Sequence, residues 1–334
     1  GVVSSNLVEC HHQQQVQAQK AARTVNHQPE ATDFPTPLSC QVSECGGNFE
    51  RMHTSSTDST AAESNAGDSD EDEPSLARSW RREHNSTINS VVPLSQDEAG
   101  SRVVLAALES APGENERIEI AARFSGYIAK AMRCQHANLI LQQCVILMEP
   151  QNLQFMVDEL GQTHAEIVQA ARHRYSCRLL QRLLKHCNAA QVSFLAEAIV
   201  GEALSLSRHT FGHFVVQHLF RFGTEDQQHR LARVVEQHVD KICRSRYGSS
   251  ILHAALTQTC PQDRLWVARA VAAVPDLLET IATRKDGEGV AMQVVEVLPE
   301  SERLPAIVTL QGVMQLDRPT KLSNFLMSLT TSSN

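Results

Sequence analysis

The chain has 334 residues, of which 42 % are hydrophobic and only 4 % aromatic, and its formal net charge is −8. This length allows one or two ordinary domains, or one domain with a long arm. Few aromatic residues favour packed helices over a β-sandwich, because strands are rich in aromatic and β-branched residues. No apolar run approaches the roughly 18 residues that cross a membrane, so we expect no membrane span.

The negative charge is concentrated near the start of the chain. Residues 1–95 hold 6 Lys or Arg and 13 Asp or Glu, and residues 96–334 hold the remaining 24 and 25. A nearly neutral domain still binds RNA when its basic side chains gather on one face. Net charge therefore neither supports nor excludes a nucleic-acid partner.

Residues 1–92 have the composition of a disordered arm. They contain a Gln-rich stretch, QQQVQAQ at 13–19, and an acidic run, DSDEDE at 68–73. Such a segment cannot bury enough apolar surface to offset the entropy lost on ordering. We predict that this arm is disordered, and that the folded domain spans residues 93–330.

The nine cysteines are scattered and no secretory segment accompanies them. Reduced thiols in the cytoplasm are the expectation, with the nucleus or nucleolus as alternatives. Cys40 and Cys45, with Cys10, His11 and His12 upstream, match no compact zinc module in their spacing. We predict no metal site and no cofactor.

A repeat begins near residue 93. Six segments each start with a small residue and a second, usually polar one and continue into an apolar run: GSRVVLAAL (100–108), ANLILQQCV (137–145), SCRLLQRLL (176–184), GHFVVQHLF (212–220), GSSILHAAL (248–256) and EGVAMQVVE (288–296). Their second positions lie 37, 39, 36, 36 and 40 residues apart. This period predicts an all-α solenoid of six helical repeats, in which each unit stacks on its neighbours.

Each of these helices has two distinct faces. At about 100° per residue, Asn138, Leu139 and Gln142 share one face, while Ile140 and Leu141 point into the stack. The same three places hold Cys177, Arg178 and Gln181, then His213, Phe214 and Gln217, then Ser249, Ser250 and His253. Two polar groups that contact a base edge and a middle group that packs on a base face suit single-stranded RNA. Helix caps and solvated glutamines are the alternative, so a protein-binding solenoid stays open at this point.

Five segments resemble known elements of Pumilio-type (PUF) repeats. YSCRLLQRLLKHC (175–187) resembles YGCRVIQRILEHC, and LSQDEAGSRVV (94–104) is similar to the opening SQDQHGSRF element. FGHFVVQHLFRFGTEDQ (211–227) resembles the YGNYVIQHVLEHG unit, and SRYGSSILHAALTQ (245–258) the unit after it. RKDGEGVAMQVVEVLPESER (284–303) is similar to the last full repeat. The resemblance implies a right-handed superhelix over residues 93–330 with a capping helical segment, although six repeats stand where the family usually has about eight.

The resemblance also implies roles for single residues. Cys177 and Gln181, with Arg178 stacking, match the family's adenine-reading arrangement, and Asn138 and Gln142 match its uracil-reading pair. Family members bind RNA antiparallel, so the C-terminal units are expected to face the 5′ end. The predicted RNA-binding residues are Ser101, Arg102, Asn138, Leu139, Gln142, Cys177, Arg178, Gln181, His213, Phe214, Gln217, Ser249, Ser250, His253 and Gln293.

Several places depart from the family pattern. Leu139 replaces a planar stacking residue, Leu105 replaces a glutamine, and His253 stands where a glutamate is expected. In the last helix Gly289 and Val290 are poor replacements at the first two places, with Gln293 as the third. These departures leave base choice open in the units that carry them.

Five arginines precede the predicted reading helices, and they are placed to meet phosphates or to be solvated. They are Arg172, Arg174, Arg208, Arg244 and Arg246.

No Ser-His-Asp, HExxH, P-loop or GxGxxG pattern stands in a plausible context, so we predict no enzyme. The family's role implies a monomer that binds messenger RNA in 3′ untranslated regions and lowers translation or stability, with the arm recruiting co-repressor proteins. The alternatives are a degenerate Pumilio-like solenoid that binds structured RNA or pre-rRNA in ribosome assembly, and a protein-interaction scaffold.

Overall fold

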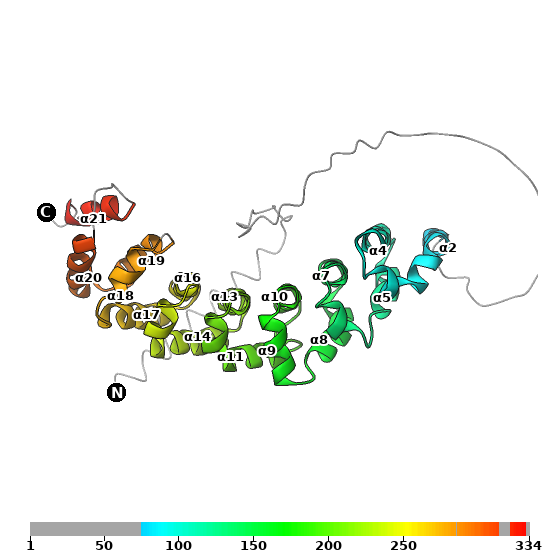
Figure 1. The fold of residues 1–334 in the computed structure, drawn as a ribbon, viewed down its shortest axis with the longest axis horizontal. Helices are drawn as coiled ribbons and strands as arrows, with labels where there is room; N and C mark the ends of the chain where they lie inside the picture. The colour runs from blue at the N-terminus through cyan, green and yellow to red at the C-terminus, as the bar shows by residue number, and fades with distance from the viewer. Residues whose placement is uncertain (1–74, 285, 314–320, 332–334) are drawn as a thin grey trace, which may run out of the picture. The chain divides into compact units, whose positions relative to one another are not determined.

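A computed structural model describes residues 75–284, 286–313 and 321–331. The described residues form helices and no strands, arranged as six stacked units of three helices (Figure 1). This confirms the predicted all-α solenoid of six repeats. The expectations for residues 1–74 lie outside the described residues. None of the helices in the described ranges combines the length and hydropathy that a membrane crossing requires.

Each unit contributes one helix to a first row, in which every helix contacts the next (Figure 1). In units one to six these are α4 (Glu98–Ser110), α7 (Ala137–Leu147), α10 (Ser176–His186), α13 (Gly212–Phe222), α16 (Gly248–Gln258) and α19 (Glu288–Val297). Each is preceded by a helix of its unit: α3 (Val91–Leu94), α6 (Ile128–Ala131), α9 (His164–Arg172), α12 (Ala203–Ser207), α15 (Val239–Cys243) and α18 (Leu277–Ala282). A second row follows: α5 (Glu114–Ala122), α8 (Gln154–Leu160) after the 3-10 turn η1 (Pro150–Leu153), α11 (Ser193–Gly201), α14 (Glu225–Gln237), α17 (Pro261–Ala273) and α20 (Glu300–Val313).

The core is continuous along the units, because the first-row helices turn their aliphatic pairs inward. Ile140 and Leu141 are fully buried, and the corresponding pairs of units three, four and five are equally enclosed, whereas in unit one Val104 is buried and Val103 is exposed. Burying one such side chain stabilises the fold by about 1.5–3 kcal/mol. The predicted inward pairs are confirmed, so the opposite face of each of these helices is available to contact a ligand.

Two further helices cover the ends of the stack. At the N-terminal end, α2 (Ser75–Asn89) packs on α4 and α5, with Trp80 buried and its Nε1 donating to Ser110 Oγ at 3.2 Å. The predicted arm boundary at residue 92 was therefore wrong, since residues 75–94 are mostly helical and partly buried. At the other end α21 (Lys321–Thr331) contacts α19 and α20 through buried Leu322 and Leu326. Terminal units of a solenoid need such covers.

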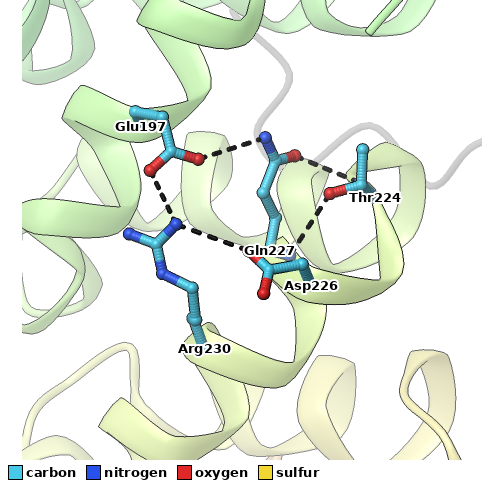
Figure 2. A network of polar contacts seen from close by, with 5 residues as sticks. All are labelled: Glu197, Thr224, Asp226, Gln227 and Arg230. Atoms are coloured by element: carbon cyan, nitrogen blue, oxygen red, sulfur yellow. Dashed lines mark hydrogen bonds and ion pairs between the residues drawn. The ribbon is translucent and has the colours of Figure 1, made fainter.

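A polar network joins neighbouring units in the second row (Figure 2). Arg230 of α14 donates to Glu197 of α11 at 2.6 Å and lies 3.5 Å from Asp226. Gln227 also donates to Glu197, and it closes a capping box with Thr224 at the start of α14. Exposed pairs of this kind contribute only about 0–1 kcal/mol each. The network therefore balances charge on this row more than it holds the units together.

Candidate nucleic-acid interface

The first-row helices present three places per unit on the face opposite the core. At the start of α16 the chain passes close to the preceding helix, and a Cβ on Gly248 would clash with the carbonyl oxygen of Ile242. The residue after this tight position is the first place of the unit. The first, second and third places, from unit one to unit six, are Ser101, Arg102, Leu105; Asn138, Leu139, Gln142; Cys177, Arg178, Gln181; His213, Phe214, Gln217; Ser249, Ser250, His253; and Glu288, Gly289, Met292. We call these residues the triplet face.

Along the triplet face, how deeply a residue is buried depends on whether it holds the first, second or third place, and not on its residue type. First places are buried in units one to five, and second places are exposed except for half-buried Phe214. Third places are half-buried except for exposed His253. A ligand on this face therefore meets the second-place side chain first and reaches the buried first place last. This order suits a flat group that stacks and is then contacted at its edge.

The register predicted for the last unit was wrong by one residue. Val290, expected at the second place, is only 3 % exposed and belongs to the core. The tight helix start is at Gly287, where a Cβ would clash with the Ile281 carbonyl oxygen, whereas a Cβ on Gly289 meets open space. Gln293 consequently lies one position beyond the third place, where its Oε1 is 3.1 Å from Nδ1 of His253.

Unit three combines a buried thiol, an exposed plane and an amide. Cys177 is fully buried, its Sγ donates to Arg174 O at 3.6 Å, and burial raises the pKa of its thiol to about 11, so it is neutral. The exposed Arg178 guanidinium lies 5.1 Å from the centre of the Phe214 ring in the next unit. Gln181 completes the triplet as a half-buried amide. These two adjacent planes form a stacking surface shared by units three and four.

Unit four uses its histidine internally. The His213 ring stacks on Tyr247 with centroids 4.3 Å apart and an angle of 11°. His213 Nδ1 lies 3.0 Å from the carbonyl oxygen of His209, and burial lowers its pKa, so the neutral ring donates from Nδ1 and keeps Nε2 as an acceptor. The third place, Gln217, has a buried Nε2 that lacks a hydrogen-bond partner. The position that the family fills with a polar base reader is therefore a packed aromatic ring here.

In unit two the polar side chains are joined in one chain of hydrogen bonds. Asn138 Nδ2 donates to the Met132 carbonyl oxygen at 2.8 Å, and Gln142 Nε2 donates to Asn138 Oδ1. Arg182 Nε of unit three donates to Gln142 Oε1 at 2.9 Å. The second place, Leu139, is 50 % exposed. The predicted uracil-reading pair is thus held in place, beside an apolar side chain that offers no planar surface.

In units one and five, some polar side chains of the triplet face contact other groups of the protein. In unit one Ser101 Oγ donates to the Glu98 carbonyl oxygen at 2.9 Å, and Arg102 pairs with the Glu98 carboxylate at 2.5 Å. In unit five Ser249 is buried, while Ser250 is exposed. The exposed His253 of unit five lies 3.1 Å from Gln293 of unit six, so both of these units engage part of their triplet face in contacts within the protein.

The helix starts of units three and four are capped by histidines. His173 Nδ1 accepts from the backbone N–H of Ser176 at 3.3 Å, and His209 Nδ1 accepts from Gly212 N–H at the same distance. A protonated ring cannot accept these bonds. Burial lowers the pKa of both rings, and nearby arginines lower it further. Both caps are therefore present in the neutral form.

The five arginines expected at phosphates are all exposed, but some of them have partners in the protein. Arg244 Nε pairs with Asp240 at 2.6 Å, and Arg172 donates to Ser205 Oγ at 3.0 Å. Arg174 lies over the ring of Tyr175, 4.9 Å from its centre.

Sequence reasoning missed a second set of cations, which lies further along α10 and α13. Arg182 and Lys185 follow the triplet of unit three, and Arg221 follows that of unit four. These cations act on a neighbouring histidine. The pKa of His218 is lowered to about 4, mainly by burial and further by the charges of Lys185 and Arg221. In the sequence, these cations could have been found as basic residues one or four positions after the third place of a unit. The four other units have none there.

The comparisons with known proteins agree with this geometry. Residues 90–121, 132–160, 166–200 and 203–235 match the Pumilio-family RNA binding repeat. The chain therefore contains Pumilio-family RNA binding repeats. The four matches fall on units one to four.

Curated Pumilio proteins match part of the chain. Pumilio homology domain family member 4 of Saccharomyces cerevisiae is 25 % identical over 134 residues, which are 39 % of this chain and 15 % of that protein. Pumilio homolog 12 of Arabidopsis thaliana is 24 % identical over 179 residues, 54 % of this chain and 30 % of that protein. The chain therefore matches less than a third of the length of these relatives.

Solved Pumilio structures share the fold. The crystal structure of PUF-8 in complex with PBE-RNA has a TM-score of 0.66 at 21 % identity, covering 77 % of this chain and 75 % of that one. The Puf3 RNA binding domain bound to a Cox17 RNA 3′ UTR recognition sequence has a TM-score of 0.61 at 16 % identity, covering 74 % of each chain.

Proposed function

We propose that the chain binds single-stranded RNA along the triplet face, with unit three selecting adenine and unit two selecting uracil. The observation that carries the proposal is the exposed Arg178 plane beside Phe214, with the buried Cys177 and the Gln181 amide at its edge. A base inserted there has a surface to stack on and polar groups at its edge. The solved relatives, which are bound to RNA, support this choice of ligand.

We extend the proposal to the biological role. The RNA is messenger RNA, bound in 3′ untranslated regions, and the outcome is reduced translation or stability in the cytoplasm. The Puf3 complex with a 3′ UTR sequence supports this extension. We further propose that the chain acts as a monomer without catalytic activity, and that co-repressor proteins supply the downstream effect.

The test is selection from a randomised pool of short RNAs by the purified 334-residue chain. The expected result is an enriched motif that contains adenine and uracil, and that the double variant C177A/Q181A no longer enriches. The matched control is Gln237→Ala, which removes an exposed glutamine from α14 in the second row.

Two other outcomes would contradict base reading. Binding without enrichment, with a steep dependence on salt and no response to C177A/Q181A, identifies a phosphate-led binder of the kind that assembles on structured RNA. Absence of RNA binding identifies a protein scaffold, which the exposed Leu139 and Ile146 on α7 would then serve.

A further inference from the structure

We propose that Arg182, on the helix of unit three, is a positioning residue for base selection by unit two. It holds the side-chain amide of Gln142 in one orientation from the neighbouring helix. This inference rests on the proposed function, because Gln142 selects a base only if the triplet face binds RNA.

The orientation of the Gln142 amide is set from both ends of a hydrogen-bond chain. At one end the Met132 carbonyl oxygen only accepts, so Asn138 turns Nδ2 toward it, at 2.8 Å, and presents Oδ1 to Gln142. At the other end Arg182 only donates, so the Gln142 atom that faces its Nε at 2.9 Å is Oε1. Both ends require Gln142 Nε2 to face Asn138. Reversal of the amide would set two acceptors against each other at one end and two donors at the other.

The bond to Arg182 adds a charged donor from a different unit. Hydrogen bonds to charged groups are shorter and stronger than neutral ones. Without it, Gln142 would be held only through Asn138, and the half-buried side chain would regain rotamers directed to solvent. With the bond to Arg182 in place, one N–H of Gln142 Nε2 and one lone pair of Asn138 Oδ1 remain for a base, side by side and in fixed positions.

The other in-register glutamines provide an internal comparison. The residue that corresponds to Arg182 is His218 in unit four and Ala254 in unit five. Gln181 therefore faces a histidine position in the next unit and Gln217 an alanine position. Gln217 Nε2 is buried with no hydrogen-bond partner, as expected for an amide that the next unit does not orient. Among the three glutamines, Gln142 is the one whose amide meets an arginine from the next unit.

The experiment compares the full chain with three variants on the RNA that the pool selects, carrying uracil or cytosine at the nucleotide read by unit two. R182M removes the donor, R182K restores a cation and a donor, and R208M removes an exposed cation elsewhere as the control. We expect R182M to lower the uracil-to-cytosine affinity ratio by about fivefold, R182K to recover part of it, and R208M to lower both affinities without changing the ratio. A ratio unchanged in R182M overturns the proposal.

An RNA-free measurement separates this proposal from the proposed function. In NMR spectra of the free chain, the Gln142 side-chain NH₂ protons are expected to exchange with solvent more slowly than in R182M, with thermal melting confirming that the variant is folded. Equal exchange in both proteins overturns the inference, even if RNA binding is confirmed. If the Gln142 side-chain protons exchange slowly but the chain binds no RNA, the amide contact is supported and the RNA-binding function is rejected.

Discussion

Units three and four differ from units one and two on the same face of the same row. In the central pair, Arg178 lies over Phe214 and His213 stacks on Tyr247, with further cations along α10 and α13. In the N-terminal pair, the corresponding surface carries half-buried Leu105, half-exposed Leu139 and exposed Ile146, and Arg102 is paired with its own helix. Yet the units share the same three-helix fold.

This difference shows that fold and ligand chemistry lie on separate faces of one helix. The aliphatic pair that holds each unit points away from the triplet, so substitutions in the triplet change the surface without changing the stack. On the proposed function, the central units supply the surfaces on which bases stack, and units one and two contribute less to affinity. We expect RNA affinity to depend mainly on α10 and α13.

The largest effect that we expect to separate the two regions is acid destabilisation of the central units. In the folded chain the pKa values of His173, His186, His209, His213 and His218 are lowered, each mainly by burial. The unfolded chain therefore takes up protons first as the pH falls below about 6.5, and stability that is complete above this pH is lost progressively toward about pH 4. A shift like that of His218 corresponds to roughly 3 kcal/mol as an upper figure. Urea titrations at several pH values measure this loss, and a midpoint constant from pH 7.5 to 4.5 would contradict it.

Removal of the central stacking plane comes next. Arg178→Ala is expected to weaken RNA binding by about 1–3 kcal/mol, because a base loses its stacking partner. Arg102→Ala, at the same place of unit one, is the control and should cost much less, since Arg102 is paired with Glu98. Fluorescence anisotropy with the selected RNA measures both. Equal losses in the two variants would remove the distinction between the regions.

The comparison can also be sharpened by a gain. Leu139→Tyr places a ring at the second place of unit two and leaves net charge unchanged. RNA affinity is expected to rise by about 1 kcal/mol, at the low end of the range for one base stack. Leu139→Ala is the control for loss of the apolar side chain. A tyrosine variant that binds no better than the alanine variant would show that unit two does not stack a base.

The smallest effect is expected in the second row. Arg230→Ala breaks the network with Glu197 and Asp226 shown in Figure 2, on a row that carries no part of the triplet face. Stability should fall by no more than about 1 kcal/mol, as is usual for an exposed pair. RNA affinity should stay within about twofold of the unmodified chain. A large loss of binding would place RNA on the second row.

Local sequence patterns were enough to predict much of the fold and the position of most triplets. The period of the small-polar-apolar segments predicted six stacked units, and the helical period placed each triplet opposite its aliphatic pair in units two to five. Both follow from the chain geometry of single helices, because side chains three and four positions apart share a face. The roles of the predicted RNA-binding residues stay predictions until binding is measured.

Contacts between units decided the rest. The register of the last unit depends on which residue packs against the Ile281 carbonyl: it is Gly287, whereas the predicted register would place Glu288 there. The bond between Arg182 and Gln142 joins residues 40 positions apart. The packing of Trp80 against Ser110 spans 30 positions, and it turns a segment of polar composition into an end cap. The sequence alone determined which face the helices of units two to five show; only stacking one unit on the next, which sets distances between residues far apart in the chain, decided which of those side chains are free to meet a ligand.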